Sequence, residues 1–309
     1  MSETAASLWT QMTGHGKLDR DRGEDALRQA LRSDDPNPLG QNLSSMAQEF
    51  VKSAMVEASC PWESKLGFLN VSKVLVEQKN ESITSKDFGR LLIRASVTLL
   101  SESEEVRVRV AAGELLGVLC QFFGTEVYDE TKTAVLAMIE KNLKREESNL
   151  VDDGEELTTK STGFTARKTA DGIFHDTAGW RNLETSMNAL EHMVVGCGPD
   201  FRPYLDQGLV ELILTALRHT NRFVRETGFN TLTSFLQTGI LSAIDGPVLE
   251  EKRAGLFAER IAAGLADNWS QVRLAASVAC RELFQSIKDD EVKTEAFFPL
   301  LLPRLCLNR

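Results

Sequence analysis

The chain has 309 residues, of which 42% are hydrophobic and 26% are charged, so it can bury a substantial core and is not disordered over most of its length. Its formal net charge of -10 disfavours proteins that bind nucleic acid or an anionic membrane surface through a basic face. Only 7% of the residues are aromatic, and Leu, Ala and Val dominate, which favours helices packed on helices over a β-sandwich.

The cysteines and the apolar segments indicate an intracellular protein. The five cysteines are far apart and include no Cys-x-x-Cys pair, so neither a zinc site nor a disulfide framework is expected; they are Cys60, Cys120, Cys197, Cys280 and Cys306. The N-terminus lacks the pattern of a secretory signal, and the apolar block near 296–302 is too short to span a bilayer. We therefore expect reduced thiols, no membrane span and a location in the cytoplasm, with the nucleus as an alternative.

Taken in order, the chain predicts one helix after another. Residues 1–38 predict a polar tail and a short helix over 21–32 that dock on the rest. Helical spacing of apolar residues predicts a helix that carries Leu43 to Met55, followed by helices over 62–78, 85–100, 106–123 and 126–145, with Gly124 as the left-handed residue beyond a helix end. The pattern lapses between about 146 and 175, and resumes in helices over 177–195, 201–219, 221–239, 248–266, 269–287 and 291–306. No convincing strand pattern occurs, so the predicted class is all-α.

A short pattern recurs at the start of several of these helices. Val-Arg at 108–109, 224–225 and 272–273 is followed by a small residue four positions after the Val, and a degenerate copy is centred on Asn182. The steps from 182 to 224 and from 224 to 272 have the length of paired-helix repeats, roughly 40–50 residues. The copy within 268–287 is the best preserved.

These residues resemble the HEAT-repeat family, in which a second helix opens with Asp or Asn, then Val-Arg, then a small residue. The resemblance covers about 39–309 and implies a right-handed α-α superhelix of HEAT or armadillo type, with the repeated helices lining an inner surface. The expected architecture is a solenoid of about five helix pairs with one long insertion at about 146–175. One pair cannot bury its apolar face alone, whereas stacked pairs share a continuous core.

The repeated helices carry a stripe of side chains beside their buried face. We predict that this stripe holds an extended or helical partner, with the candidate contacts Arg225, Arg273, Arg281, Met187 and Phe229. The alternative for the arginines is that they bond to neighbouring carbonyls or acids and fasten one repeat to the next. Trp62, Trp180 and Trp269 precede helices of this type, either as binding hot spots or as packing over a turn.

The insertion at about 146–175 is too polar to bury a core, and we expect it to be mobile. Its candidate regulatory residues are the acidic Asp152, Asp153, Glu155 and Glu156 and the hydroxyl-bearing Thr158, Thr159 and Ser161. The functional hypothesis is a docking or phosphorylation segment. The alternative is a surface insertion without a function of its own.

The sequence carries no signal of catalysis. The four histidines lie in unrelated settings, and no phosphate loop, nucleophile elbow or metalloprotease signature occurs, so we expect no enzyme, no cofactor and no metal. The predicted function is a non-catalytic scaffold or adaptor for other proteins, including basic or extended segments. The alternatives are a transport- or chaperone-type receptor that wraps a client, and a helical-repeat enzyme acting on DNA bases, which would need a basic, aromatic groove. The sequence predicts no polar capping helix after the last helix, so we expect either a fragment of a longer solenoid or an end that is covered by a partner or by a second copy through self-association.

Overall fold

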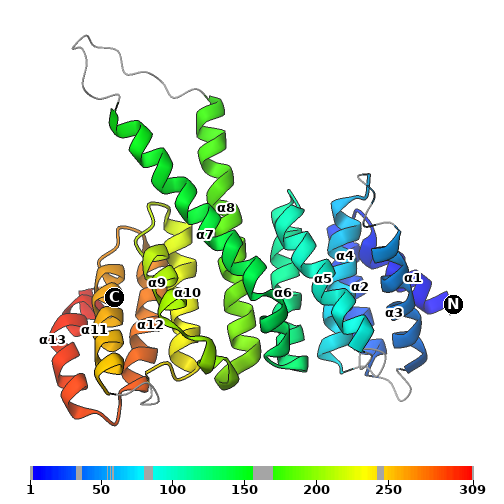
Figure 1. The fold of residues 1–309 in the computed structure, drawn as a ribbon. Helices are drawn as coiled ribbons and strands as arrows, with labels where there is room; N and C mark the ends of the chain where they lie inside the picture. The colour runs from blue at the N-terminus through cyan, green and yellow to red at the C-terminus, as the bar shows by residue number, and fades with distance from the viewer. Residues whose placement is uncertain are drawn as a thin grey trace. The chain divides into compact units, whose positions relative to one another are not determined.

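The regular secondary structure in the described part of the chain is all helical. Figure 1 shows the computed structural model, which describes residues 3–32, 37–53, 55, 57, 59–79, 86–155, 170–241 and 247–307. Within these residues there are thirteen α-helices and one 3-10 helix, and no strand. The predicted all-α class is confirmed. The chain forms two compact units: unit 1 comprises Met1–Val135 and Val195–Cys197, and unit 2 comprises Leu136–Val194 and Gly198–Arg309.

Unit 1 consists of three consecutive helix hairpins and the start of a seventh helix. Its helices are α1 (Glu3–Thr13), α2 (Lys17–Ala30), α3 (Asn37–Lys52), α4 (Trp62–Glu77), α5 (Lys86–Glu102), α6 (Val106–Phe123) and the first part of α7 (Glu126–Glu155). The odd helices α1, α3 and α5 contact one another in order, as do the even helices α2, α4 and α6. The predicted N-terminal tail thus supplies α1 and α2, and α1 packs on α4.

Unit 2 repeats this kind of packing. It contains the rest of α7, most of α8 (Ala170–Cys197), the 3-10 helix η3 (Gly198–Tyr204), α9 (Gln207–Ala216), α10 (Arg222–Gln237), α11 (Pro247–Leu265), α12 (Ser270–Ser286) and α13 (Glu291–Leu307). Helix α10 packs on both α9 and α12, and α11 packs on both α12 and α13. This order of contacts is consistent with a helical bundle or with a solenoid.

The helix boundaries follow local chemistry, and some differ from the prediction. Helix α6 has the predicted bounds, whereas α7 continues past 145 to Glu155 and α8 begins at Ala170, so helical backbone covers both ends of the predicted insertion. No proline or glycine interrupts 146–153, so this stretch lacks the residues that most strongly end a helix. The single helix predicted over 201–219 is wrong. Pro203 lacks an N–H, and the Asp206 carboxylate accepts the N–H of Leu209 at 2.8 Å, which starts α9 as a separate helix.

Small residues let the two helices of a hairpin approach closely. A Cβ on Gly23 of α2 would lie 2.8 Å from Cγ of Met12 in α1, and one on Gly228 of α10 would lie 3.0 Å from Cδ2 of Leu217 at the end of α9. Gly228 is one of the small residues of the repeated Val-Arg pattern, so that position serves packing. None of the helices in the described part of the chain has the length and apolarity that a membrane crossing requires.

Candidate functional site

The arginines of the repeated Val-Arg pairs close the turns of their own hairpins. Each is the fourth residue of its helix, and its Nη1 donates to carbonyls five or six residues earlier: Arg109 to Ser103 (2.7 Å) and Glu104 (3.3 Å), Arg225 to His219 and Thr220 (both 2.8 Å), and Arg273 to Asp267 (2.9 Å). Arg20 of α2 makes the same bonds, to Gly14 (2.8 Å) and His15 (2.9 Å). We call these four residues the turn-closing arginines.

Arg225 also connects its hairpin to the next one. Its Nε and Nη2 donate to the two carboxylate oxygens of Asp267, at 2.8 and 3.1 Å, and Asp267 lies in the turn between α11 and α12. The same carboxylate accepts the N–H of Trp269 at 3.0 Å. Burial raises the pKa of Asp267, but the hydrogen bonds from Arg225 and Trp269 outweigh that effect and hold the pKa below its ordinary value. Arg225 therefore joins its own hairpin to the next one, which favours the alternative interpretation of this arginine.

The apolar candidates for partner contact are core residues. The side chains of Met187 and Phe229 are 0% and 1% exposed, so neither presents a surface to a partner, and this corrects the prediction. Phe229 is buried because its ring packs against Gly264 of α11, where a side chain would collide with it. Arg281 is different: its side chain is 63% exposed and pairs with Glu282 at 2.8 Å. Of the predicted contacts, Arg281 alone has an exposed side chain.

The carboxyl group of Glu191 is partly buried on α8. Glu191 lies one helical turn beyond Met187, on the same face of the helix, and burial raises the pKa of its carboxyl group to about 7.

The tryptophans pack against side chains of neighbouring hairpins. The guanidinium carbon of Arg107 lies 3.9 Å from the ring centroid of Trp62, and that of Arg222 lies 3.8 Å from the ring of Trp269. Trp180 stacks on Phe223 with centroids 4.9 Å apart. These contacts favour the packing interpretation of the tryptophans.

The predicted regulatory segment is described only in part. Asp152, Asp153 and Glu155 lie within α7. Glu156, Thr158, Thr159 and Ser161 lie outside the described residues.

A groove between α5 and α7 is the candidate binding site, and the sequence did not point to it. This α5/α7 groove has a volume of about 360 Å³ and is lined by Gly89, Arg90, Ile93, Phe123, Glu126, Val127, Asp129 and Glu130. Ile93 and Val127 are buried at its floor, and the half-buried ring of Phe123 forms one wall. Because α5 and α7 are separated by a whole helix in the sequence, periodicity within each helix could not reveal their shared groove.

The turn between α6 and α7 positions Phe123, which forms one wall of this groove. Gly124 follows Phe123 with φ 79° and ψ -158°, a conformation that glycine alone adopts readily, and its N–H donates to the carbonyl of Cys120 at 2.8 Å. The predicted glycine stop is confirmed in position, although its ψ is extended and not left-handed helical. Gly89 forms the other side. A Cβ there would lie 2.7 Å from the ring of Phe123, so the missing side chain lets that ring sit directly on α5.

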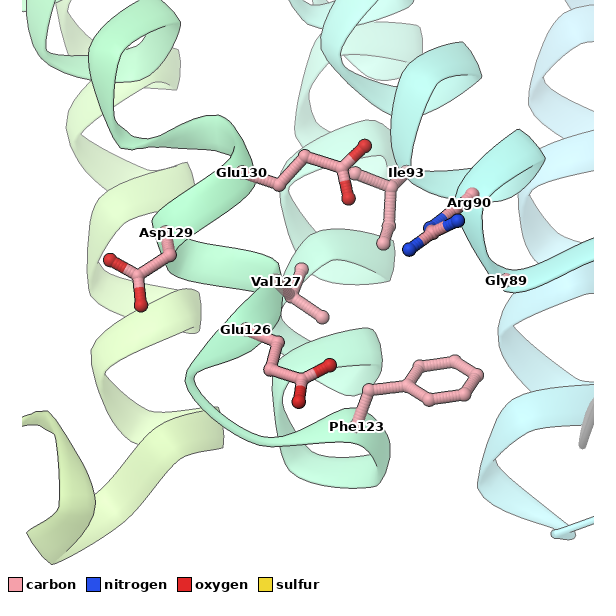
Figure 2. Close-up of a pocket in the computed structure, with 8 residues that line it drawn as sticks. All are labelled: Gly89, Arg90, Ile93, Phe123, Glu126, Val127, Asp129 and Glu130. Atoms are coloured by element: carbon pink, nitrogen blue, oxygen red, sulfur yellow. The ribbon is translucent and has the colours of Figure 1, made fainter. Parts of the chain in front are cut away.

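Three charged side chains surround the mouth of the groove. Figure 2 shows the guanidinium of Arg90 directed toward the space between the carboxylates of Glu126 and Glu130, while Asp129 points away. Asp129 instead pairs with Lys132 at 2.7 Å. Within the described part of the chain, neither Glu126 nor Glu130 forms an ion pair, and both are exposed. The groove thus combines an apolar floor with two exposed carboxylates that form no ion pair within the described residues.

Comparison with known proteins leaves the family open. No protein-family model matches the sequence, and a search of curated proteins finds no match. Among solved structures, the chain is similar to a crystal structure of an engineered protein, with 14% identity and a TM-score of 0.47, over 93% of this chain and 98% of the other.

The lining of the α5/α7 groove contains three carboxylates and one guanidinium, and it holds no cysteine, histidine or serine. Across the described residues, no three His, Cys, Asp or Glu side chains gather as a metal site would require. Two carboxylates beside an apolar floor can accept a Lys or Arg side chain together with a neighbouring aliphatic one.

Proposed function

We propose that the protein is a non-catalytic scaffold that binds other proteins through the α5/α7 groove. The observation that supports this most is the pairing of an apolar floor with the free carboxylates of Glu126 and Glu130. Charge complementarity then specifies the occupant: a segment with a basic residue next to an aliphatic one. The acidic balance of the whole chain, -10, favours encounter with such a segment.

We further propose that the helices belong to a right-handed HEAT-like solenoid. The recurrence of the turn-closing arginine in four hairpins, α1–α2, α5–α6, α9–α10 and α11–α12, supports a repeated structural unit. None of the five cysteines, all of which lie among the described residues, is in a disulfide, which supports a reducing compartment, the cytoplasm or the nucleus.

A peptide selection tests the binding proposal. A displayed library of random peptides is selected on the whole immobilised protein, and enriched peptides are labelled with fluorescein for anisotropy measurements. We expect enrichment of Lys or Arg beside Leu, Ile or Val. In the double variant Glu126→Gln with Glu130→Gln, the affinity should fall on the order of tenfold, since each exposed ion pair contributes up to roughly 1 kcal/mol.

The matched control changes two exposed acids of unit 1 that lie outside the groove. Glu102→Gln with Glu104→Gln alters the net charge by the same amount and should leave the affinity near the wild-type value. Equal weakening by the two double variants would reduce the effect to general electrostatics and refute the site. Enriched peptides without basic residues would refute the proposed occupant.

A further inference from the structure

A second groove lies on the opposite side of α5 from the α5/α7 groove. This α3/α5 groove has a volume of about 580 Å³ and is lined by Val51, Met55, Asp87, Arg90, Leu91, Arg94, Ala95 and Thr98. The end of α3 supplies Val51, and the chain that follows folds back so that the N–H of Met55 donates to the carbonyl of Phe50 at 2.9 Å. Met55 and Leu91 give the groove an adaptable apolar surface, since methionine adjusts to many shapes.

The charge of the α3/α5 groove is opposite to that of the α5/α7 groove. Arg90 and Arg94 are both exposed, and neither forms an ion pair or a hydrogen bond within the described residues. Asp87 is the one acidic residue that lines this groove, so its lining carries a net charge of +1 from two arginines and one aspartate. A carboxylate is the group that two neighbouring guanidinium groups bind best in a protein partner.

Arg90 joins the two grooves. It lines both of them, whereas Arg94 lines the α3/α5 groove and Glu126 and Glu130 line the α5/α7 groove. Helical spacing explains this: Gly89 and Ile93 face one side of α5, Asp87, Arg94 and Thr98 face the other, and Arg90 lies between. Arg94 therefore lies across α5 from the α5/α7 groove that Glu126 and Glu130 line, at a separation of the width of one helix, ~10 Å.

We infer that the protein-binding surface takes a bipolar segment that lies across α5, with a basic residue in the α5/α7 groove and an acidic residue in the α3/α5 groove. This rests on the proposed function and specifies its partner. A separation of about 10 Å corresponds to about seven residues of a helical partner or about three of an extended one. The partner sequence should therefore carry opposite charges at a fixed spacing, with aliphatic residues between them.

The test uses the peptides selected on the whole protein and the variant Arg94→Gln. We expect enriched peptides to carry Asp or Glu at a constant distance from their Lys or Arg. Arg94→Gln should weaken those peptides about twofold to fivefold, in line with one exposed ion pair, and should not affect derivatives whose acidic residue is replaced by Gln or Asn. Arg22→Gln removes an exposed arginine of unit 1 outside both grooves and serves as the control.

A charge exchange makes the test stricter. Arg94→Glu should abolish most binding of the acidic peptide, and a peptide with Lys in place of its acidic residue should recover it. If Glu126→Gln with Glu130→Gln weakens binding while Arg94→Gln matches the Arg22→Gln control, the bipolar partner is refuted and the α5/α7 site stands. If the peptides respond to neither set of variants, both proposals are refuted.

Discussion

At the scale of single residues, Asp267 is the point where two hairpins meet. Its carboxylate holds Arg225 of α10 and the N–H of Trp269, while its carbonyl accepts from Arg273 of α12. A carboxyl whose folded pKa is depressed contributes stability above its unfolded pKa, about 3.9, and that contribution is lost as the pH falls through the folded pKa. The ion pair between Arg225 and Asp267 therefore contributes to the stability of the fold at neutral pH.

Replacing this carboxylate should cost stability in a pH-dependent way. Asp267→Asn keeps the shape but leaves Arg225 without its anion, and we expect a loss of about 1–3 kcal/mol in the free energy of unfolding at pH 7. The loss should shrink as the pH falls below about 3.9 and through the lowered pKa of the folded carboxyl, because the wild-type carboxyl then also takes up its proton. Urea unfolding across this pH range measures both quantities. The exposed Asp289→Asn is the control, and an equal loss in both variants would contradict the bridge.

Glu191 should show the opposite dependence. Its folded pKa of about 7 lies above its unfolded value of about 4.3, so the wild-type protein loses stability as the pH rises through that interval, because ionisation is easier in the unfolded chain. We expect Glu191→Gln to be more stable than the wild type by about 1–3 kcal/mol at pH 8 and nearly equal at pH 4. Thermal unfolding at the two pH values checks this, and a constant difference would refute it.

At the scale of elements, the short turn between α6 and α7 determines one wall of the α5/α7 groove. We expect Gly124→Ala to cost about 1–3 kcal/mol, because alanine is strained at φ 79° and ψ -158° even though no atom lies near its Cβ. Peptide binding should weaken as well, since Phe123 and Glu126 flank this turn. Gly255→Ala in α11 is the control: its Cβ also meets nothing, its helical backbone suits alanine, and it should stabilise by about 0.5–1 kcal/mol. Equal effects of the two changes would show that backbone strain is not the cause.

Element boundaries show what the sequence could and could not reveal. Helix α6 was predicted residue for residue because its apolar spacing, its opening and its glycine stop agree. The break between η3 and α9 was missed because the apolar spacing runs through it, although Pro203 and the capping Asp206 were visible. At this point Pro203 and Asp206 predict the helix break, whereas the apolar periodicity does not.

At the scale of the whole chain, the recurrence of Val-Arg predicts a repeated unit. The prediction of which side chains face outward from that unit is wrong for two residues. Phe229 and Met187 occupy the stripe beside the buried face, yet both are buried, and Phe229 packs against Gly264 of α11. The fourth turn-closing arginine, Arg20, was missed because no Val precedes it, although Gly23 follows at the same distance as Gly228 follows Arg225. The candidate grooves depend on pairs of helices that are distant in sequence, which periodicity within one helix does not report.

The turn-closing arginines have a consequence for how such a chain arises and assembles. The bonds from each one to the carbonyls of its own turn span no more than six residues, so a hairpin closes its turn with contacts that are local in the sequence. Chains rich in local contacts fold quickly, and each hairpin can close before its neighbours arrive. A duplicated hairpin would carry its closure with it, so the number of hairpins can change in evolution without new residues being selected to hold each added turn.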